Sequence, residues 1–217
     1  AANEYFCMTA AKRAGLPVPE FYLSDNGGLF IMRRFDLTPG GVSMGFEDMC
    51  SLQALGTPQK YASSYERVAK SIRDFVSSEQ VMSAREHFFA SLVLSVMLRN
   101  GDAHLKNFGV LYASPGQTVT FAPLYDVVTT TAYIRNDVPA LSLAGTKKWW
   151  PRKTLERFAL AHLSLPVKTV RETFQRVADA VSDTRGDLSA YQADHPDFRA
   201  VGDAMLRAWE DGLRELK

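Results

Sequence analysis

Apolar residues recur at helical spacing along most of the chain. Ala84, Phe88, Leu92 and Val96, for example, are four positions apart, so they fall on one face of a helix. Glycine and proline residues at the ends of such patterns mark where helices begin and end. The patterns predict helices at residues 4–14, 47–55, 64–76, 78–98, 153–162, 167–181 and 197–216.

Two short hairpins interrupt the helical pattern. In each, apolar strand-forming residues flank a turn that is rich in Gly, Asn, Asp or Pro. The first hairpin pairs residues 20–24 with 29–35, and the second pairs residues 108–112 with 118–122. With so little strand beside so much helix, the predicted fold class is α+β and mainly helical.

The composition is that of one ordinary globular domain. The 217 residues are 46% hydrophobic and 23% charged, and no repeat, low-complexity tract or linker divides them. The net charge of +1 gives no reason to expect direct binding to nucleic acid. Cys7 and Cys50 lack the spacing of a metal site and are expected to be reduced core residues. Apolar runs shorter than a membrane span of roughly 20 residues, and the lack of a signal-peptide pattern, predict a cytoplasmic protein without a membrane partner.

The loop Asn100-Gly-Asp-Ala-His-Leu-Lys-Asn107 carries the candidate chemistry, together with Asp126 after the second hairpin. Because a hairpin returns its two ends to one place, the oxygens of Asp102, Asn107 and Asp126 are expected to converge. Phosphoryl transfer requires a carboxylate beside the acceptor hydroxyl and hard oxygen ligands for Mg²⁺. Asp and Asn are also common turn residues, so each residue alone predicts a turn, and only the joint pattern predicts a kinase-like site.

Several segments resemble the HipA-like serine/threonine kinases of bacterial toxin-antitoxin systems. They are spread over most of the chain in the order that this family shows. They are Asn3-Glu-Tyr-Phe6, Ala14-Gly-Leu-Pro-Val-Pro19, Arg33-Arg-Phe-Asp36, Glu47-Asp-Met-Cys50, Asn100-Gly-Asp-Ala-His-Leu-Lys-Asn-Phe-Gly109 and Pro123-Leu-Tyr-Asp-Val-Val128. The resemblance implies a protein-kinase-like carboxy-terminal lobe with the rear part of the amino-terminal lobe.

The resemblance also implies roles for the residues of the loop. Asp102 would be the catalytic base of ATP-dependent transfer to a Ser or Thr, and Asn107 and Asp126 would hold Mg²⁺. Lys106 is placed with Asp102 in the catalytic group, where it would approach the transferring phosphate, although it also suits a solvated loop cation. His104 is placed with the cofactor-binding residues. A lone His in a loop also suits a hydrogen-bonding brace, and suits it better than metal ligation.

A nucleotide-binding hinge strand at residues 33–36 is a further implication of the resemblance. Backbone groups near Arg33 and Phe35 would face the adenine of ATP, and the Asp36 carboxylate would face the ribose. On the residues alone, Asp36 is better explained as the cap of the following turn.

The whole chain is interpreted as a single kinase region, in which residues 1–36 are the remnant of the smaller lobe with the hinge and residues 37–217 are the helical lobe. HipA-like kinases carry a glycine-rich phosphate loop and a phosphate-binding lysine upstream of the segment that resembles Asn3-Glu-Tyr-Phe6. No such glycine-rich cradle occurs in this sequence. We therefore expect a fragment of a longer protein, or one half of a kinase that is split over two chains.

The family resemblance implies two partners, an aminoacyl-tRNA synthetase as the protein substrate and a small DNA-binding antitoxin. Two other classes of function stay open. One is an inactive kinase-like module that binds a partner. The other is a metal-dependent hydrolase that uses Asp102, His104 and Asp126, although it lacks the further His and Asp ligands that such centres generally need.

Two other runs carry chemically suggestive residues. Lys147-Lys-Trp-Trp-Pro-Arg-Lys153 interleaves basic and aromatic residues, as single-strand nucleic-acid sites do, but a packed Trp pair flanked by solubilising charge is the preferred interpretation. Thr129-Thr-Thr131 follows Asp126 and suits either phosphorylation or hydroxyls that satisfy a turn, of which we prefer the second.

Overall fold

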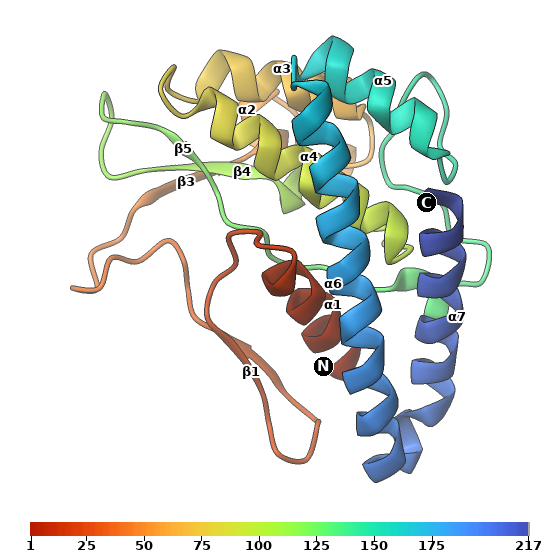
Figure 1. The fold of residues 1–217 in the computed structure, drawn as a ribbon. Helices are drawn as coiled ribbons and strands as arrows, with labels where there is room; N and C mark the ends of the chain where they lie inside the picture. Colours follow the sequence, from red (N-terminus) through yellow and green to blue (C-terminus); the bar gives the residue numbers. More distant parts are fainter. Residues whose placement is uncertain (217) are drawn as a thin grey trace.

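The structure, a computed structural model that describes residues 1–216, is mainly helical (Figure 1), which confirms the predicted α+β fold class. The helices are α1 (Ala2–Arg13), α2 (Met49–Leu52), α3 (Tyr65–Phe75), α4 (Val81–Met97), α5 (Arg152–His162), α6 (Val167–Asp194) and α7 (Arg199–Leu216). Short 3-10 helices are η1 (Thr57–Gln59), η2 (Leu105–Asn107), η3 (Thr130–Ala132) and η4 (Pro196–Phe198). The long α6 runs through the middle of the molecule and packs against α1, α4 and α7.

Both predicted hairpins are confirmed, in two small antiparallel sheets. The strands are β1 (Phe21–Leu23), β2 (Phe30–Met32), β3 (Gly45–Asp48), β4 (Gly109–Tyr112) and β5 (Thr120–Phe121). β1 pairs with β2, and the second sheet has the order β3-β4-β5. The turn between β4 and β5 is closed by a hydrogen bond from the Gln117 N–H to the Ser114 carbonyl (3.1 Å). The hairpin therefore returns the chain to the end of the loop that precedes β4.

The helix predicted at residues 47–55 is wrong over its first part, because residues 45–48 form β3. Gly45 lies opposite Tyr112 and Asp48 lies opposite Gly109, so the strand depends on a partner far along the chain that local periodicity does not reveal. Only α2 remains helical. Its first turn is capped by Asp48, whose side chain accepts a hydrogen bond from the Ser51 N–H (2.9 Å).

The helix predicted at residues 167–181 is too short, because α6 continues to Asp194. The apolar spacing weakens after Val181, where several polar residues and Gly186 follow. The buried face nevertheless continues at helical spacing through Thr184, Leu188 and Gln192. The Thr184 hydroxyl donates to the Ala180 carbonyl (2.7 Å), so this polar residue is buried without an unsatisfied group. The other predicted helices are confirmed within a few residues at each end.

The α4 helix is the centre of the hydrophobic core. Residues 87–97 are all buried, on every side of the helix. Among the described residues, 81–98 form the one segment that is long and apolar enough to cross a membrane, but 67% of it is buried inside the protein. Because neighbouring helices cover it, we describe it as a core helix.

The two cysteines are free and buried, as the sequence predicts. Burial raises the pKa of the Cys7 thiol to about 12, so the thiol stays protonated at neutral pH. Burial also raises the pKa of Cys50. Neither cysteine is therefore a candidate nucleophile.

Acidification is expected to destabilise the fold through His87. The imidazole is buried on α4 beside Phe121, and burial lowers its pKa from 6.5 to about 4. Between these values the unfolded chain binds a proton that the folded chain does not. The free energy of unfolding should therefore fall as the pH drops from 6.5 to 4, by up to about 3 kcal/mol from this residue. Urea unfolding at several pH values measures this free energy. In the His87→Leu variant it should depend less on pH between 4 and 6.5. An unchanged slope in that variant would contradict the assignment.

Candidate active site

The loop between α4 and β4 is held by the side chains of its own Asn residues. Asn100 Oδ1 accepts a hydrogen bond from the Asp102 N–H (3.1 Å), and Asn107 Oδ1 accepts one from the His104 N–H (2.9 Å). Both Asn side chains are buried. The turn chemistry of Asn therefore fixes the backbone that carries Asp102, whose own side chain is partly exposed (45%).

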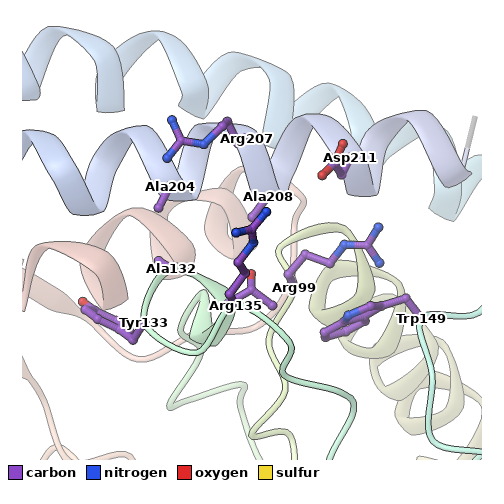
Figure 2. Close-up of a pocket in the computed structure, with 10 residues that line it drawn as sticks. Arg99, Ala132, Tyr133, Arg135, Trp149, Ala204, Arg207, Ala208 and Asp211 are labelled. Carbon is purple, nitrogen blue, oxygen red and sulfur yellow. The ribbon is translucent and has the colours of Figure 1, made fainter.

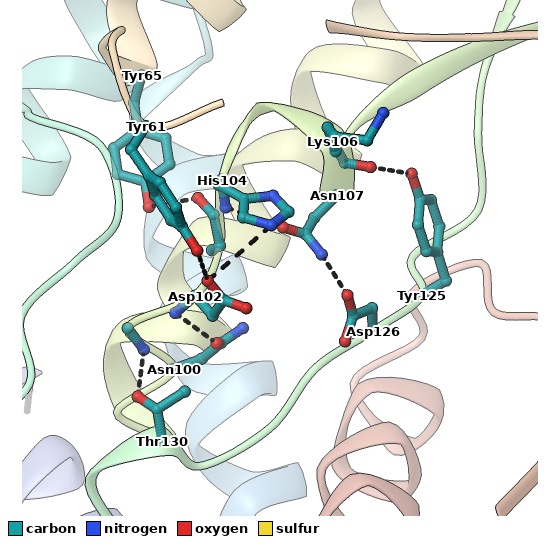
Figure 3. Close-up of polar contacts among 12 residues, drawn as sticks. Tyr61, Tyr65, Asn100, Asp102, His104, Lys106, Asn107, Tyr125, Asp126 and Thr130 are labelled. Carbon is teal, nitrogen blue, oxygen red and sulfur yellow. Dashed lines mark hydrogen bonds and ion pairs between the residues drawn. The ribbon is translucent and has the colours of Figure 1, made fainter. Parts of the chain in front are cut away.

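Asn107 and Asp126 lie side by side, as the hairpin predicts. Asn107 Nδ2 donates a hydrogen bond to Asp126 Oδ2 (2.7 Å), and Figure 3 shows Asp102 in the same cluster of polar side chains. Asp126 has φ of 57°, a left-handed conformation that non-glycine residues seldom adopt. Backbone strain of this kind concentrates at functional sites, because the surrounding structure has to maintain it.

Tyr61, which the sequence did not single out, contacts the proposed catalytic base. Its hydroxyl donates a hydrogen bond to Asp102 Oδ1 (2.7 Å) from the loop between η1 and α3 (Figure 3). Burial and this hydrogen bond both raise the pKa of Tyr61, so the phenol remains a donor at neutral pH. The two residues are 41 positions apart, and no local pattern in the sequence connects them.

Lys106 forms an ion pair with Asp48, a second residue that the sequence did not single out. Lys106 Nζ lies 2.5 Å from Asp48 Oδ2, and the Asp48 side chain is only 10% exposed. Burial by itself would raise the pKa of Asp48, but Lys106 and the Ser51 N–H outweigh it and the pKa is lowered. The same contact raises the pKa of Lys106. Lys106 is therefore a paired cation at the side of the loop and not a freely solvated one.

His104 is buried beside Asp102. Its Nε2 lies 3.9 Å from Asp102 Oδ1, beyond hydrogen-bond distance, and its ring packs edge-on against Tyr61. Burial lowers the pKa of His104, although Asp102 opposes the shift. The ring packs between Tyr61 and the loop, but its Nδ1 has no hydrogen-bond partner among the described residues and its Nε2 is too far from Asp102, so the hydrogen bonds expected of a brace are not formed.

The predicted hinge strand is corrected by the structure, because β2 ends at Met32 and residues 35–36 form a turn. The Arg33 N–H is used by the first hairpin, where it donates to the Glu20 carbonyl (2.8 Å). Both Asp36 oxygens accept hydrogen bonds from the Arg34 guanidinium (2.9 and 2.5 Å), which lowers the pKa of Asp36. Neither carboxylate oxygen accepts from a backbone N–H of residues 37–40, so the interpretation of Asp36 as the cap of the following turn is not confirmed.

Phe35 nevertheless connects this turn to the polar cluster. The centroid of its ring lies 5.0 Å from the centroid of the Tyr125 ring, and the Tyr125 hydroxyl donates to the Lys106 carbonyl (2.5 Å). Tyr125 directly precedes Asp126. The segment that the resemblance identifies as the hinge thus packs against the loop that carries the proposed metal ligands.

Comparison with known proteins identifies the family. The family model described as the HipA-like C-terminal domain matches residues 1–185. The chain belongs to this family. It is 31% identical over 198 residues to "Putative kinase Y4dM" of Sinorhizobium fredii, covering 80% of this chain and 46% of that protein. It is 27% identical over 147 residues to a "Putative kinase" of Haemophilus influenzae, covering 61% of this chain and 42% of that protein. The HipA-like chain thus spans less than half the length of these relatives.

Solved structures share the fold of the HipA-like chain. HipA in the Shewanella oneidensis complex of HipA, HipB and operator DNA superposes with a TM-score of 0.77 at 17% identity, over 99% of this chain and 55% of that one. The Helicobacter pylori proinflammatory kinase CtkA superposes with a TM-score of 0.65 at 16% identity, over 99% of this chain and 82% of that one. The predicted kinase-like α+β fold is confirmed.

Asn3 anchors the segment that follows Asp126 in this HipA-like domain. Its side chain pairs with both backbone groups of Thr129, accepting from the Thr129 N–H (2.8 Å) and donating to the Thr129 carbonyl (3.1 Å). The Thr129 hydroxyl accepts from Trp209 Nε1 (2.7 Å), and both Asn3 and Thr129 are buried. The Thr129 hydroxyl therefore satisfies the Trp209 indole of α7, and not a turn of its own run as the sequence interpretation expects. These contacts of Asn3, Thr129 and Trp209, here called the Asn3 clamp, tie α1 and α7 to the proposed site.

The donor groups beside Asp126 suit a hard cation. Asp126 supplies a solvent-exposed carboxylate, and Asn107 supplies an amide whose Nδ2 contacts Asp126 Oδ2 while its Oδ1 accepts from the His104 N–H. Rotation of this amide would turn its oxygen toward a cation beside Asp126. Burial raises the pKa of Glu4, and repulsion by Asp126 raises it further, so the two carboxyl groups interact across this site. Two protein oxygen ligands, completed by water and phosphate oxygens, are typical of Mg²⁺. In the described part of the chain no group of three His, Cys, Asp or Glu residues is arranged to hold a metal, so the hydrolase alternative lacks its centre.

Proposed function

We propose that this HipA-like domain is the catalytic portion of a kinase that transfers the γ-phosphoryl group of ATP to a Ser or Thr of a protein. The observation that carries the proposal is the contact between Asn107 and Asp126 on the two loops that flank one hairpin, the first of which also holds Asp102. Family membership and relatives named as kinases support the same reaction class.

Asp102 is the residue placed to act on the acceptor. In its ionised form the carboxylate accepts the proton of a Ser or Thr hydroxyl as that oxygen attacks the γ-phosphorus and the bond to the β-phosphate oxygen breaks. The Asp102 side chain is 45% exposed, so a substrate hydroxyl would reach it beside the Tyr61 hydroxyl that donates to Oδ1. Mg²⁺ held by Asn107 and Asp126 would neutralise charge on the phosphates.

Lys106, His104 and the 33–36 segment complete the proposal. Lys106 would leave its ion pair with Asp48 and bind a phosphate oxygen instead. His104 would support Asp102 by packing beside it from a buried position. Asp36 would hold the ribose after release from Arg34, with adenine beside Phe35. Backbone contacts to adenine would come from atoms other than the Arg33 N–H, because the first hairpin uses that group.

The proposed partners follow from the family. HipA of Shewanella oneidensis was solved in complex with HipB and operator DNA. By analogy we propose an antitoxin partner that binds DNA and an aminoacyl-tRNA synthetase as the phosphorylated protein, in the cytoplasm. This chain itself, with a net charge of +1, is not proposed to bind nucleic acid chains directly.

A second candidate is an inactive kinase-like module, or one half of a split kinase. The observation that favours it is that the functional carboxylates all have partners within the chain. Asp102 accepts from Tyr61, Asp126 from Asn107, and Asp36 from Arg34. A module of this kind would bind a partner without binding nucleotide.

Titration calorimetry with ATP separates the two candidates. We expect residues 1–217 to bind ATP weakly, with a dissociation constant of about 0.1–1 mM, because the sequence contains no glycine-rich cradle for the phosphates. Mg²⁺ should strengthen binding about tenfold relative to EDTA. Asp126→Asn should remove most of the Mg²⁺ effect, while the exposed α6 substitution Asp183→Asn should leave it intact. Binding that is undetectable, or indifferent to Mg²⁺ in the wild type, would favour the inactive module.

A further inference from the structure

A cavity outside the proposed kinase site lies between η3 with its following turn and the helix α7 (Figure 2). Its volume is about 710 Å³, within the range of small-molecule sites. Its walls carry three arginines, Arg99, Arg135 and Arg207, and two aromatic residues, Tyr133 and Trp149. So many guanidinium groups around one cavity indicate an anionic ligand.

Arg99 is the buried member of this group. It is only 5% exposed, and its guanidinium lies against Trp149, with the guanidinium carbon 4.9 Å from the ring centroid. Nη2 pairs with Glu215 Oε1 (2.8 Å), but Nη1 has no hydrogen-bond partner among the described residues. An unsatisfied buried donor costs about 1–3 kcal/mol, more when charged, so its retention calls for an explanation.

The backbone of Arg99 is strained as well. Arg99 follows the last turn of α4 with φ of 56°, at the position where a helix end normally has Gly. A Gly there would relieve the strain but would remove the side chain from the cavity. The chain therefore keeps both a strained backbone and an unsatisfied donor at the residue that lines this cavity.

Arg135 and Arg207 supply the accessible charge. Both side chains are exposed, and neither forms an ion pair with any residue between 1 and 216. Figure 2 shows Arg135 reaching from the turn after η3 toward α7, where Arg207 and Asp211 lie. Asp211, the acidic residue of the lining, is paired with Arg214 (2.5 Å). Thr131 Oγ1, also in the lining, is a further buried group without a partner in the described chain.

The exposure of the aromatic rings indicates whether this cavity suits a nucleic acid strand or a single nucleotide. Trp150 is 1% exposed, and one face of Trp149 is covered by Arg99, so the 147–153 run offers no pair of free rings for successive bases. The preferred interpretation of that run as a packed Trp pair is therefore confirmed. Tyr133, at 63% exposure, is the one open ring in the cavity lining.

We propose that this cavity binds a nucleoside phosphate. The phosphate is held by Arg135 and Arg207 with the Arg99 guanidinium and the Thr131 hydroxyl behind them, and the base lies against Tyr133. Charge-assisted contacts from Arg to phosphate and stacking on one aromatic ring match this class of ligand. The proposal does not depend on the proposed kinase function.

The cavity is connected to the loop of Asp102. The Thr130 hydroxyl donates to the Arg99 carbonyl (3.2 Å) and accepts from the Gly101 N–H (2.8 Å). Gly101 directly precedes Asp102 in the chain, and Arg99 lies three positions before it. The Thr130 hydroxyl thus connects the backbone of Arg99, at the cavity, to the backbone that carries Asp102.

The test is titration calorimetry of the chain with AMP, with inorganic phosphate and adenosine as separate probes. AMP should bind more tightly than either probe. Arg135→Gln and Arg207→Gln should each weaken AMP binding about tenfold or more, because each removes a charge-assisted contact. Both residues are exposed, so melting temperatures should not change. The matched control is Arg171→Gln, which removes an exposed arginine of α6 outside the cavity.

The outcomes separate this cavity from the proposed ATP site. AMP affinity that survives Asp126→Asn and Asp36→Ala but falls in the two arginine variants supports the proposal. Affinity that falls in Asp36→Ala and survives in the arginine variants places AMP at the hinge and overturns it. Phosphate that binds as tightly as AMP, or a phosphotyrosine peptide that binds more tightly, overturns the nucleotide assignment.

Discussion

Replacing Asp126 by Asn in the full-length protein is expected to lower the rate of phosphoryl transfer about a thousandfold or more, while the fold stays intact. A neutral amide is a poor substitute for a carboxylate ligand of Mg²⁺, so the charge that balances the cation is lost. The Asn107 Nδ2 hydrogen bond can persist, because the oxygen of the new amide still accepts it. The left-handed backbone at this position also tolerates Asn better than other residues without a carboxylate.

Radiolabelled transfer from ATP to the protein substrate measures the rate, and circular dichroism measures the fold. Asp102→Asn should lower the rate to a similar degree, because an amide cannot accept the proton of the acceptor hydroxyl. It should keep the Tyr61 contact through the amide oxygen. Asp183→Asn, an exposed carboxylate on α6, should leave the rate unchanged. A rate that survives Asp126→Asn would disprove the metal assignment.

The contact between Asn107 and Asp126 could be predicted because its parts are local. Asp102 and Asn107 share one loop, and Asp126 is brought back to Asn107 by a single short hairpin with a recognisable turn. The end of the preceding helix, the turn and the two strands of the hairpin are each marked by residue types that can be recognised in the sequence. The structure then places Asn107 and Asp126 in contact, as the hairpin argument requires.

The supporting residues could not be predicted, because their partners are distant in the chain. Asp48 meets Lys106 across 58 positions, and the strand that positions Asp48 forms only when β4 pairs with it. Apolar residues after Phe46 look the same whether the segment is a helix or a short strand. In this case tertiary pairing overrides local propensity.

The hinge segment shows the limit of a family resemblance. Residues 33–36 were assigned to a strand through motif similarity, but an Arg34–Asp36 ion pair and a turn replace it. Sequence could not show that Arg34 would take both carboxylate oxygens of Asp36. Phe35 packs against Tyr125 beside the proposed site, but the hydrogen bonding of the segment differs from the expectation.

Asn3→Ala is expected to cost about 3–5 kcal/mol of folding free energy, an unusually large loss for one side chain. The change removes both hydrogen bonds to Thr129 and leaves its N–H and carbonyl unsatisfied in the core. It also leaves a cavity beside Cys7, whose thiol donates to Asn3 Oδ1 (3.4 Å). Urea unfolding gives the free energy, and Asn136→Ala, at an exposed Asn, should change it by less than about 0.5 kcal/mol.

The same clamp predicts a functional effect that stability alone does not. Thr129 is three residues after Asp126, so loss of the Asn3 contacts should let the strained backbone at Asp126 relax. At temperatures where Asn3→Ala remains folded, Mg²⁺ should therefore strengthen ATP binding less than it does in the wild type. A destabilised variant that keeps the full Mg²⁺ effect would show that the clamp supports the core but does not hold Asp126 in place.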